Sequence, residues 1–238
     1  MTLPLPEPTS KDSYVTPIVN KIAWLTILVI SIALVVLNIV GITHFDTMEI
    51  IAFISGLISV WLAVLNSHWN WPIGIVNCIA FFILFWQARL FANAALQVLF
   101  IIISIWGWYE WLMGGKNKTA LPITRMNRPQ IVRMTLLFPI LSIIIGTLLV
   151  KANGSATIWD AATTSASIIA IYIMGKRQIE NWIIWVSVDT VYLFLFISQD
   201  LTLTAFLYII FLIMSTNGFI AWKRERTIYN LRVTQSQI

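Results

Sequence analysis

Four residues with chemically useful side chains recur along one short stretch in the second half of the sequence. Trp182, Trp185, Asp189 and Tyr192 are separated by 3, 4 and 3 positions, and this spacing places them on one face of a helix. Two indole planes beside a carboxylate suit a ligand with a flat ring and hydroxyl groups, including a cationic ring, because aromatic faces attract cations. The alternative is structural: Trp182 would belong to an interfacial aromatic belt, and Asp189 would bond to a neighbouring helix.

The depth of Asp189 in its apolar segment favours a binding role. About eight apolar-segment residues flank it on either side, so it should lie near the bilayer midplane, where a carboxylate costs about 2.5 to 3.5 kcal/mol. A charge at this depth has to face a polar cavity or a partner. The sequence therefore predicts a cavity at Asp189 that its aromatic neighbours help to line.

No catalytic motif accompanies these residues. The sequence contains no HExxH, no GxSxG and no glycine-rich phosphate loop. His44 and His68 fall between apolar runs, and the single cysteine, Cys78, lies inside one, so neither residue type predicts a metal site. We therefore expect a protein that is not an enzyme and that uses no cofactor.

The elements that must position these residues are transmembrane helices. The chain is 59% hydrophobic and 11% charged, with a mean hydropathy of +0.85, which is far more apolar than a soluble domain. Apolar runs of about 20 residues cross a bilayer core, and they must be helical because lipid offers backbone groups no partners. The sequence predicts an all-α membrane protein with eight such helices, at 21–41, 48–67, 70–87, 92–113, 132–150, 157–175, 181–198 and 201–222.

The distribution of basic residues predicts the topology. With a cytoplasmic N-terminus, all but two of the 15 Lys and Arg residues, Arg89 and Lys151, fall on the inner side. This asymmetry favours a multi-pass protein of the bacterial inner membrane with both termini in the cytoplasm. Residues 1–20 do not resemble a signal peptide and are expected to be a disordered tail, as 223–238 are expected to be a short cytoplasmic tail. The net charge of +5 then needs no nucleic-acid partner, and membrane lipid is the expected surrounding.

An internal repeat organises the eight segments. Shifting the sequence by 111 positions, the distance from Asn70 to Asn181, aligns rare residues without a gap: Trp71 with Trp182, Gly107 with Gly218 and Trp111 with Trp222. The repeat unit is therefore three helices, 48–113 and 157–222. Three spans reverse the chain direction, and the connector within 114–156, which follows a basic loop, restores it. The predicted architecture is a leading helix followed by a 3+1+3 arrangement of parallel repeats, with a substrate held between the halves.

The repeat also relates the remaining candidate residues. Gly74 and Cys78 stand where the second unit has Trp185 and Asp189, so the second unit would supply the bulky and charged groups and the first would leave room. Further polar or aromatic side chains within the spans are Asn77, Gln97, Ser104, Asn217 and Trp106, which occupies the repeat position of Asn217. Each amide can serve either ligand contact or a hydrogen bond between helices.

Several stretches of the sequence resemble a known family. WNWPIGIVNCIAFFILFWQ, ENWIIWVSVDTVYLFLF and NGFIAWKR are similar to the PnuC family of vitamin B3 transporters. The resemblance covers about 48–224, and its most specific motifs are WNWP and the W-x-x-W-x-x-x-D pattern of Trp182, Trp185 and Asp189. It implies a fold similar to that of SWEET sugar transporters.

The resemblance implies uptake of nicotinamide riboside by facilitated diffusion, with cytoplasmic phosphorylation trapping the product for NAD biosynthesis. A pyridinium would stack on Trp, a carboxamide would meet Asn or Gln, and ribose hydroxyls would reach Asp or Gln. Because no basic residue lies at midplane depth, the mononucleotide would be rejected. The residues expected around the ligand are Trp182, Trp185, Asp189, Tyr192, Asn217, Gln97, Trp106 and Asn77.

Other functions remain open on the residues alone. A transporter of another nucleoside or of a sugar would use the same bundle, although the aromatic residues beside a carboxylate favour a cationic ring. A receptor or scaffold usually carries a soluble domain, and the segment after Trp222 is too short for one. An intramembrane enzyme would need the motifs that are absent. A homo-oligomer, specifically a trimer, is also expected, although apolar faces toward lipid and toward a second copy look alike in sequence.

Overall fold

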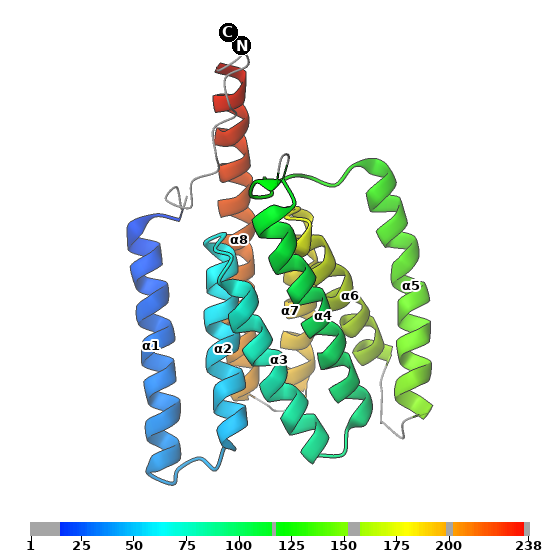
Figure 1. Cartoon of the computed structure of the whole chain (residues 1–238). Coiled ribbons are helices and arrows are strands. Elements are labelled where there is room, and N and C mark those ends of the chain that lie inside the picture. The colour runs from blue at the N-terminus through cyan, green and yellow to red at the C-terminus, as the bar shows by residue number, and fades with distance from the viewer. Residues whose placement is uncertain (1–14, 116–117, 152–157, 199–201, 236–238) are drawn as a thin grey trace.

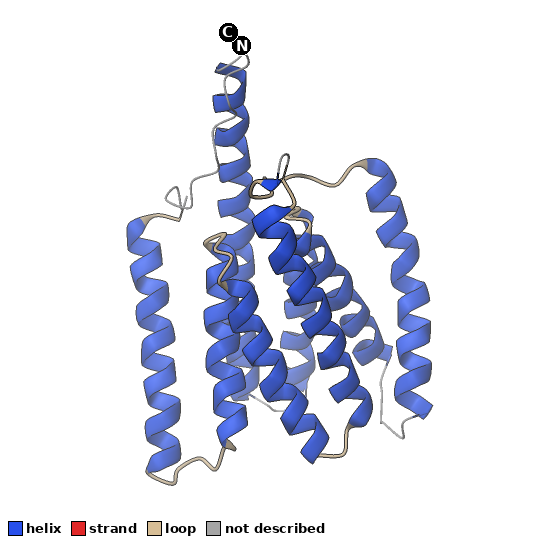
Figure 2. Ribbon diagram, in the orientation of Figure 1, coloured by secondary structure: helices blue, strands red, loops and turns tan. Residues whose placement is uncertain are grey.

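The computed structural model describes residues 15–115, 118–151, 158–198 and 202–235. Apart from one isolated bridge between Thr124 and Gln178, the regular structure in these ranges is helical, and all eight predicted helices are present (Figure 2). The helices are α1 (Pro17–Ile39), α2 (Thr47–Val64), α3 (Asn70–Gln87), α4 (Phe91–Met113), α5 (Arg128–Lys151), α6 (Ile158–Gly175), α7 (Glu180–Ser198) and α8 (Thr202–Gln235). Over their described residues, seven of them, all but α7, are long and apolar enough to cross a membrane.

The helix ends follow local capping rather than hydropathy. α1 begins at Pro17, inside the predicted tail, because the Thr16 hydroxyl caps the first turn and proline suits the first helical position. The remainder of the predicted tail, residues 1–14, lies outside the described residues. α2 opens on a capping box, in which Asp46 accepts a hydrogen bond from the Met48 amide (2.7 Å) and Glu49 accepts one from the Asp46 amide (2.9 Å).

The last helix is longer than predicted. α8 continues from Trp222 to Gln235, through the charged segment that was expected to be a tail, and projects beyond the other helices (Figure 1). Outside hydrocarbon a helix needs no apolar residues, so the hydropathy signal stops where the membrane would end while the helix goes on. The described start of α1 and the end of α8 lie at the same end of the bundle.

Two triplets of helices form the centre of the bundle. The first triplet is α2, α3 and α4, the second is α6, α7 and α8, and within each one neighbours in sequence pack together. The triplets meet where α4 contacts α6 and where α2 contacts α8, and these two contacts are equivalent at the 111-residue offset. α1 and α5 stand at the two edges (Figure 1), packed on α2 and α6. A site shared by the triplets therefore lies in the middle of the bundle.

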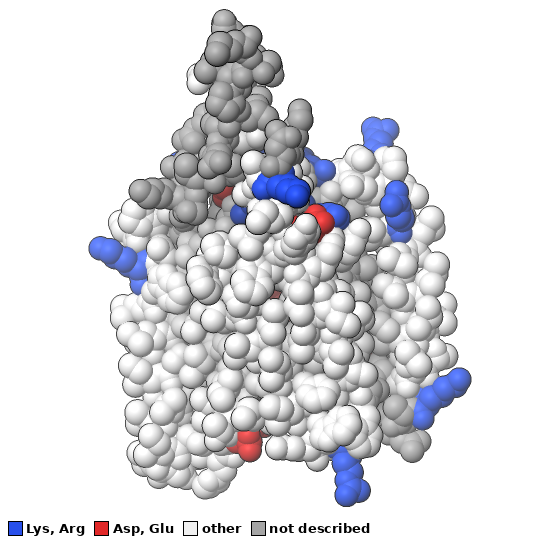
Figure 3. All heavy atoms as spheres, viewed as in Figure 1, with Lys and Arg blue, Asp and Glu red and all other residues white. Residues whose placement is uncertain are grey.

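Charged side chains avoid the outer surface around the middle of the bundle. Figure 3 shows Lys and Arg gathered mainly at the end from which α8 projects, a few at the opposite end, and a wide uncharged band between them. Exposed aliphatic residues cover this band, as on α1, where Ile27 is the only buried residue of the helix. The surface thus matches a bilayer solvent.

Four tryptophans close the bundle at the end from which α8 projects. Trp71, Trp111, Trp182 and Trp222 are all at most 2% exposed. The rings of Trp71 and Trp111 meet edge to face at 5.4 Å, those of Trp182 and Trp222 do so at 5.5 Å, and Trp111 contacts Trp222 at 5.6 Å. We call these residues the tryptophan cluster. It joins the two triplets through an aromatic contact between α4 and α8.

Two reciprocal hydrogen bonds reinforce this junction. The Trp111 indole N–H donates to the backbone carbonyl of Met174 on α6 (2.9 Å), and the Trp222 indole N–H donates to that of Ala63 on α2 (3.0 Å). Both donors and both acceptors are related by 111 positions. Each triplet therefore holds the other by the same kind of bond.

Arg177, in the turn between α6 and α7, lies beside the tryptophan cluster. Its guanidinium donates to the side-chain oxygen of Asn66 (2.8 Å), to the Asn66 carbonyl and to the Leu121 carbonyl, and it lies 4.5 Å from the Trp111 ring centroid. Asn66 in turn donates to Glu225 on α8 (2.6 Å). Burial lowers the pKa of Arg177 to about 10, an effect that the negative charge of Glu225 opposes. The Arg177 side chain is therefore cationic at neutral pH. It joins its own turn to the turn between α2 and α3, which contains Asn66, and Asn66 links both turns to α8.

Candidate functional site: a cavity between the two triplets

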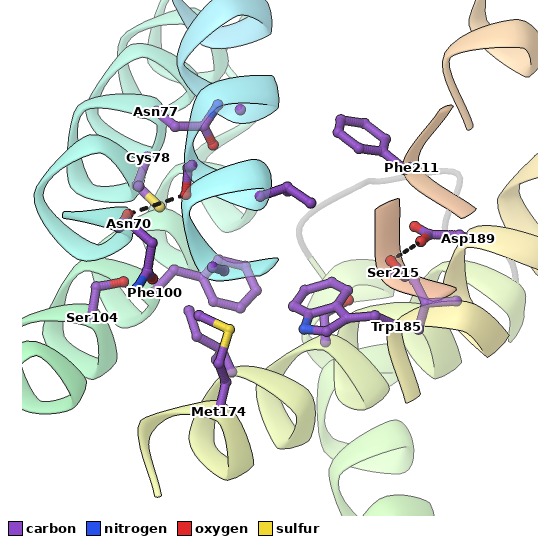
Figure 4. A pocket seen from close by; sticks show the side chains of 18 of the residues that line it. Asn70, Asn77, Cys78, Phe100, Ser104, Met174, Trp185, Asp189, Phe211 and Ser215 are labelled. Carbon is purple, nitrogen blue, oxygen red and sulfur yellow. Dashed lines mark hydrogen bonds between the residues drawn. The ribbon is translucent and has the colours of Figure 1, made fainter. Parts of the chain in front are cut away.

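A cavity of about 440 Å³ lies between the triplets, within the range of small-molecule sites. All six helices of the triplets contribute to its lining, and no described residue of α1 or α5 does. In Figure 4, one wall carries the labelled residues Asn70, Asn77, Cys78, Phe100 and Ser104, and the opposite wall carries Trp185, Asp189, Phe211 and Ser215. The cavity is thus shared by both halves, and the tryptophan cluster borders it through Trp71 and Trp182.

The charge of the cavity comes from one residue. Asp189 on α7 is 6% exposed, and the Ser215 hydroxyl on α8 donates to its Oδ2 atom at 2.8 Å (Figure 4). Among the described residues that line the cavity, Asp189 carries the only charged side chain, and none is Lys, Arg or His. A carboxylate so far from water and without a cation makes the cavity attractive to a positively charged ligand.

Aromatic rings border the same space. Trp185 and Phe100 project into the gap between the walls (Figure 4). Phe211 lies 111 positions after Phe100 and lines the second wall. Tyr192 and Tyr208 complete this wall, with ring centroids 5.0 Å apart. These rings offer flat faces to a planar ligand, and the negative charge of Asp189 lies on the same wall.

Neutral polar groups of the first triplet face the charged wall. Asn77 donates to the Ala52 carbonyl (2.5 Å), which fixes its amide at the wall of the cavity. The backbone carbonyl of Asn70 accepts a hydrogen bond from Ser59 (3.1 Å), and Ser104 is 3% exposed. These groups suit the hydroxyl and amide groups of a small ligand.

Six of the eight predicted ligand residues line this cavity: Trp182, Trp185, Asp189, Tyr192, Gln97 and Asn77. Trp182 is 2% exposed, so it does not belong to a lipid-facing belt. Asp189 does bond to a neighbouring helix, through Ser215, and it lines the cavity as well.

Trp106 and Asn217 are not among the residues that line the cavity. The Trp106 ring stacks on Tyr172 with centroids 5.2 Å apart and an interplanar angle of 6°, and the Lys176 ammonium lies 4.7 Å from its centroid. Asn217 donates to the Ile213 carbonyl of its own helix at 2.8 Å. The positions of Trp106 and Asn217 within apolar segments indicated that both lie in membrane-spanning helices. These positions do not show which face of each helix points toward the cavity.

The sequence analysis did not single out Ser215, Tyr208 or Phe211. The 111-residue offset carried a usable signal for two of them, because it pairs Ser215 with Ser104 and Tyr208 with Gln97, which were both candidates. Phe211 falls on Phe100, which was not a candidate. Applying the repeat to every polar candidate would therefore have found Ser215 and Tyr208 but not Phe211.

Comparison with known proteins places the chain in a family of transporters. The family described as nicotinamide mononucleotide transporter matches residues 46–224. The nicotinamide riboside transporter PnuC of Escherichia coli (strain K12) is 27% identical over 207 residues, covering 75% of this chain and 87% of that protein. The riboflavin/roseoflavin transporter RibM of Streptomyces davaonensis is 26% identical over 176 residues, covering 71% and 80%.

A solved structure has the same fold. The crystal structure of the vitamin B3 transporter PnuC superposes with a TM-score of 0.71 at 16% sequence identity, over 88% of this chain and 92% of that chain. The family match spans both triplets, the connector α5 and therefore every residue that lines the cavity. This multi-pass membrane protein belongs to the PnuC family of nicotinamide mononucleotide transporters.

Proposed function

We propose that this protein carries nicotinamide riboside across the membrane through the cavity between the triplets. In the proposed orientation both termini are cytoplasmic, which puts the basic end of the bundle inside. Movement follows the concentration gradient of the riboside, which cytoplasmic phosphorylation of the product maintains. The family membership and the PnuC relative support this assignment.

The observation that carries the proposal is the isolated carboxylate of Asp189. The riboside presents a planar pyridinium cation, and the cavity offers one negative charge on a wall that also carries Trp185 and Phe211. A cation over aromatic faces is stabilised by the ring quadrupole as well as by the carboxylate. The ribose and carboxamide then meet neutral polar groups such as Asn77 and Gln97.

The relative RibM makes riboflavin a second candidate ligand. Riboflavin is flat and hydroxylated but uncharged, so it would leave the carboxylate of Asp189 without a counter-charge. A cationic ligand that neutralises this charge should bind more tightly than an uncharged ligand that only fills the cavity. We therefore favour the cationic riboside over the flavin.

Calorimetric titration of the purified protein with nicotinamide riboside, nicotinamide mononucleotide and riboflavin tests the proposal. We expect saturable binding of the riboside alone, with a change in tryptophan fluorescence. Trp185→Ala and Asp189→Ala should each weaken this binding by at least tenfold. Saturable binding of riboflavin without the riboside would instead make the protein a flavin transporter.

Trp86→Ala is the matched control for Trp185→Ala. Trp86 lies on α3, is 57% exposed and is not among the residues that line the cavity. This variant removes the same side chain from the lipid-facing surface and should bind the riboside as the unmodified protein does. Equal loss of binding in both tryptophan variants would show that the effect of Trp185 is not local, and the cavity would lose its assignment.

A further inference from the structure

Two residues at equivalent positions of the repeat follow the ends of α2 and α6. Asn66 and Arg177 are 111 positions apart, and both have a left-handed backbone, with φ of 55° and 54°. In both turns the same two backbone hydrogen bonds close the helix, in the pattern of a Schellman motif. Glycine or asparagine is usual at this position, because most side chains strain a left-handed backbone. Asn66 follows this rule and Arg177 does not, so the reason for an arginine lies in what its side chain contacts.

The Arg177 side chain crosses from the second triplet to the first. Its Nε atom donates to the side-chain oxygen of Asn66 (2.8 Å), one terminal nitrogen donates to the Asn66 carbonyl (3.3 Å), and the guanidinium lies 4.5 Å from the centroid of the Trp111 ring. The other terminal nitrogen donates to the carbonyl of Leu121, whose own amide donates to the Trp111 carbonyl (3.3 Å). Only the planar, five-donor guanidinium can make all of these contacts at once.

These contacts lie at the closed end of the cavity. Trp111 belongs to the tryptophan cluster, and its indole N–H donates to the Met174 carbonyl (2.9 Å). The same carbonyl accepts the backbone amide of Arg177 (2.8 Å), so both the backbone and the guanidinium of Arg177 are fixed against the cluster. A ligand that leaves the cavity past the cluster requires the triplets to part at the place that Arg177 bridges.

We propose that Arg177 is a latch that holds the cavity closed at the end from which α8 projects, by binding the first triplet through Asn66 and Trp111. This inference rests on the proposed function, which makes this end the cytoplasmic exit. Opening exchanges the hydrogen bonds of the guanidinium for hydrogen bonds to water, so the latch releases reversibly. It consumes no energy and acts alike on both directions of facilitated diffusion.

The neighbours of the latch show how to strengthen it. Asn66 lies between two charged groups, because its oxygen accepts a hydrogen bond from Arg177 and its nitrogen donates one to Glu225 on α8 (2.6 Å). The guanidinium therefore meets a neutral amide, which holds a cation less tightly than a carboxylate does. Combining Asn66→Asp with Glu225→Gln moves the carboxylate into contact with Arg177. The pair keeps the net charge and a hydrogen bond between positions 66 and 225, and aspartate tolerates the left-handed backbone.

The single cysteine of the chain reports on the latch without any ligand. Cys78 lines the cavity and is 9% exposed. A membrane-impermeant methanethiosulfonate with a trimethylammonium group reaches this thiol from the end from which α8 projects only while the triplets are parted there. Labelling is measured from each side, in inside-out vesicles and in spheroplasts, with a C-terminal tag that marks the side on which this end lies.

Arg177→Gln should speed labelling from this end about tenfold, because it removes the contacts that cross the junction, without speeding labelling from the opposite side. Arg224→Gln is the matched control, since Arg224 is an exposed arginine on α8 at the same end; it should label as the unmodified protein does. Unchanged labelling of a folded Arg177→Gln protein would overturn the latch.

The combined exchange of Asn66→Asp and Glu225→Gln tests the latch in the opposite direction and keeps it testable if Arg177→Gln does not fold. We expect labelling from the same end to slow about tenfold. Labelling as fast as in the unmodified protein would overturn the proposal. None of these measurements involves the riboside, so a failure to bind it would refute the proposed function separately.

Discussion

The charge of Asp189 can be tested with a pair of ligands that differ only in charge. Nicotinamide riboside has a cationic pyridinium, and its reduced dihydropyridine form has the same ribose and carboxamide without the charge. Asp189→Asn keeps the shape of the side chain and an oxygen that can accept the bond from Ser215, which lies 2.8 Å from Asp189 in the structure. The variant and the ligand pair therefore isolate one interaction between two charges.

The expected magnitude follows from the burial of the carboxylate. At a separation of about 5 Å and an effective dielectric constant of about 20, two unit charges attract by about 3 kcal/mol, which is roughly a hundredfold in Kd. The unmodified protein should therefore bind the cationic form roughly a hundredfold more tightly than the reduced form, and Asp189→Asn should bind the two almost equally. Calorimetry of the unmodified protein and of Asp189→Asn with both ligands gives the four Kd values. If Asp189→Asn weakens both forms to the same extent, the carboxylate does not act through its charge and the reasoning fails.

Three further results are expected. Nicotinamide mononucleotide should not compete with the riboside in binding assays, because no described lining residue is basic; comparable competition by both would contradict this. Trp111→Phe and Trp222→Phe each remove one of two equivalent hydrogen bonds and part of a buried ring. Each variant should therefore lower the free energy of unfolding in detergent by about 2 kcal/mol. Unequal losses would show that the two bonds are not equivalent. Ser215→Ala should weaken riboside binding by about fivefold because the carboxylate loses its donor. Ser165→Ala removes an equally buried serine that bonds to its own helix and does not line the cavity, so it should change binding less than twofold; the reverse order would refute the role of Ser215.

The helices were predictable because lipid leaves the backbone only one way to satisfy its polar groups. Apolar runs therefore located α2 to α7 within a few residues, even where the polar Asp189 interrupts α7. The extension of α8 past Trp222 was missed because the same signal vanishes outside hydrocarbon, while hydrogen bonds within the helix persist. Hydropathy thus predicts where a span crosses the membrane better than where its helix ends.

The candidate site was predictable in its charged half and less so elsewhere. Asp189 was conspicuous because a buried carboxylate is costly. A serine within an apolar helix carries little information, since most bond to their own helix, as Ser55 does to Ile51 (2.5 Å) and Ser165 to Ala161 (2.7 Å). Ser215 departs from this pattern only through the position of α7, which is a tertiary fact. The same holds for Trp106, whose ring faces Tyr172 rather than the cavity.

The reciprocal indole bonds also bear on which end of the bundle is closed. Trp111 donates to α6 and Trp222 donates to α2, so both bonds cross from one triplet to the other. The ring contact between Trp111 and Trp222 crosses the junction as well, whereas the contacts of Trp71 with Trp111 and of Trp182 with Trp222 lie within one triplet each. Separation of the triplets at this end would therefore have to break two hydrogen bonds and one aromatic contact, while the tryptophan pair within each triplet could stay intact.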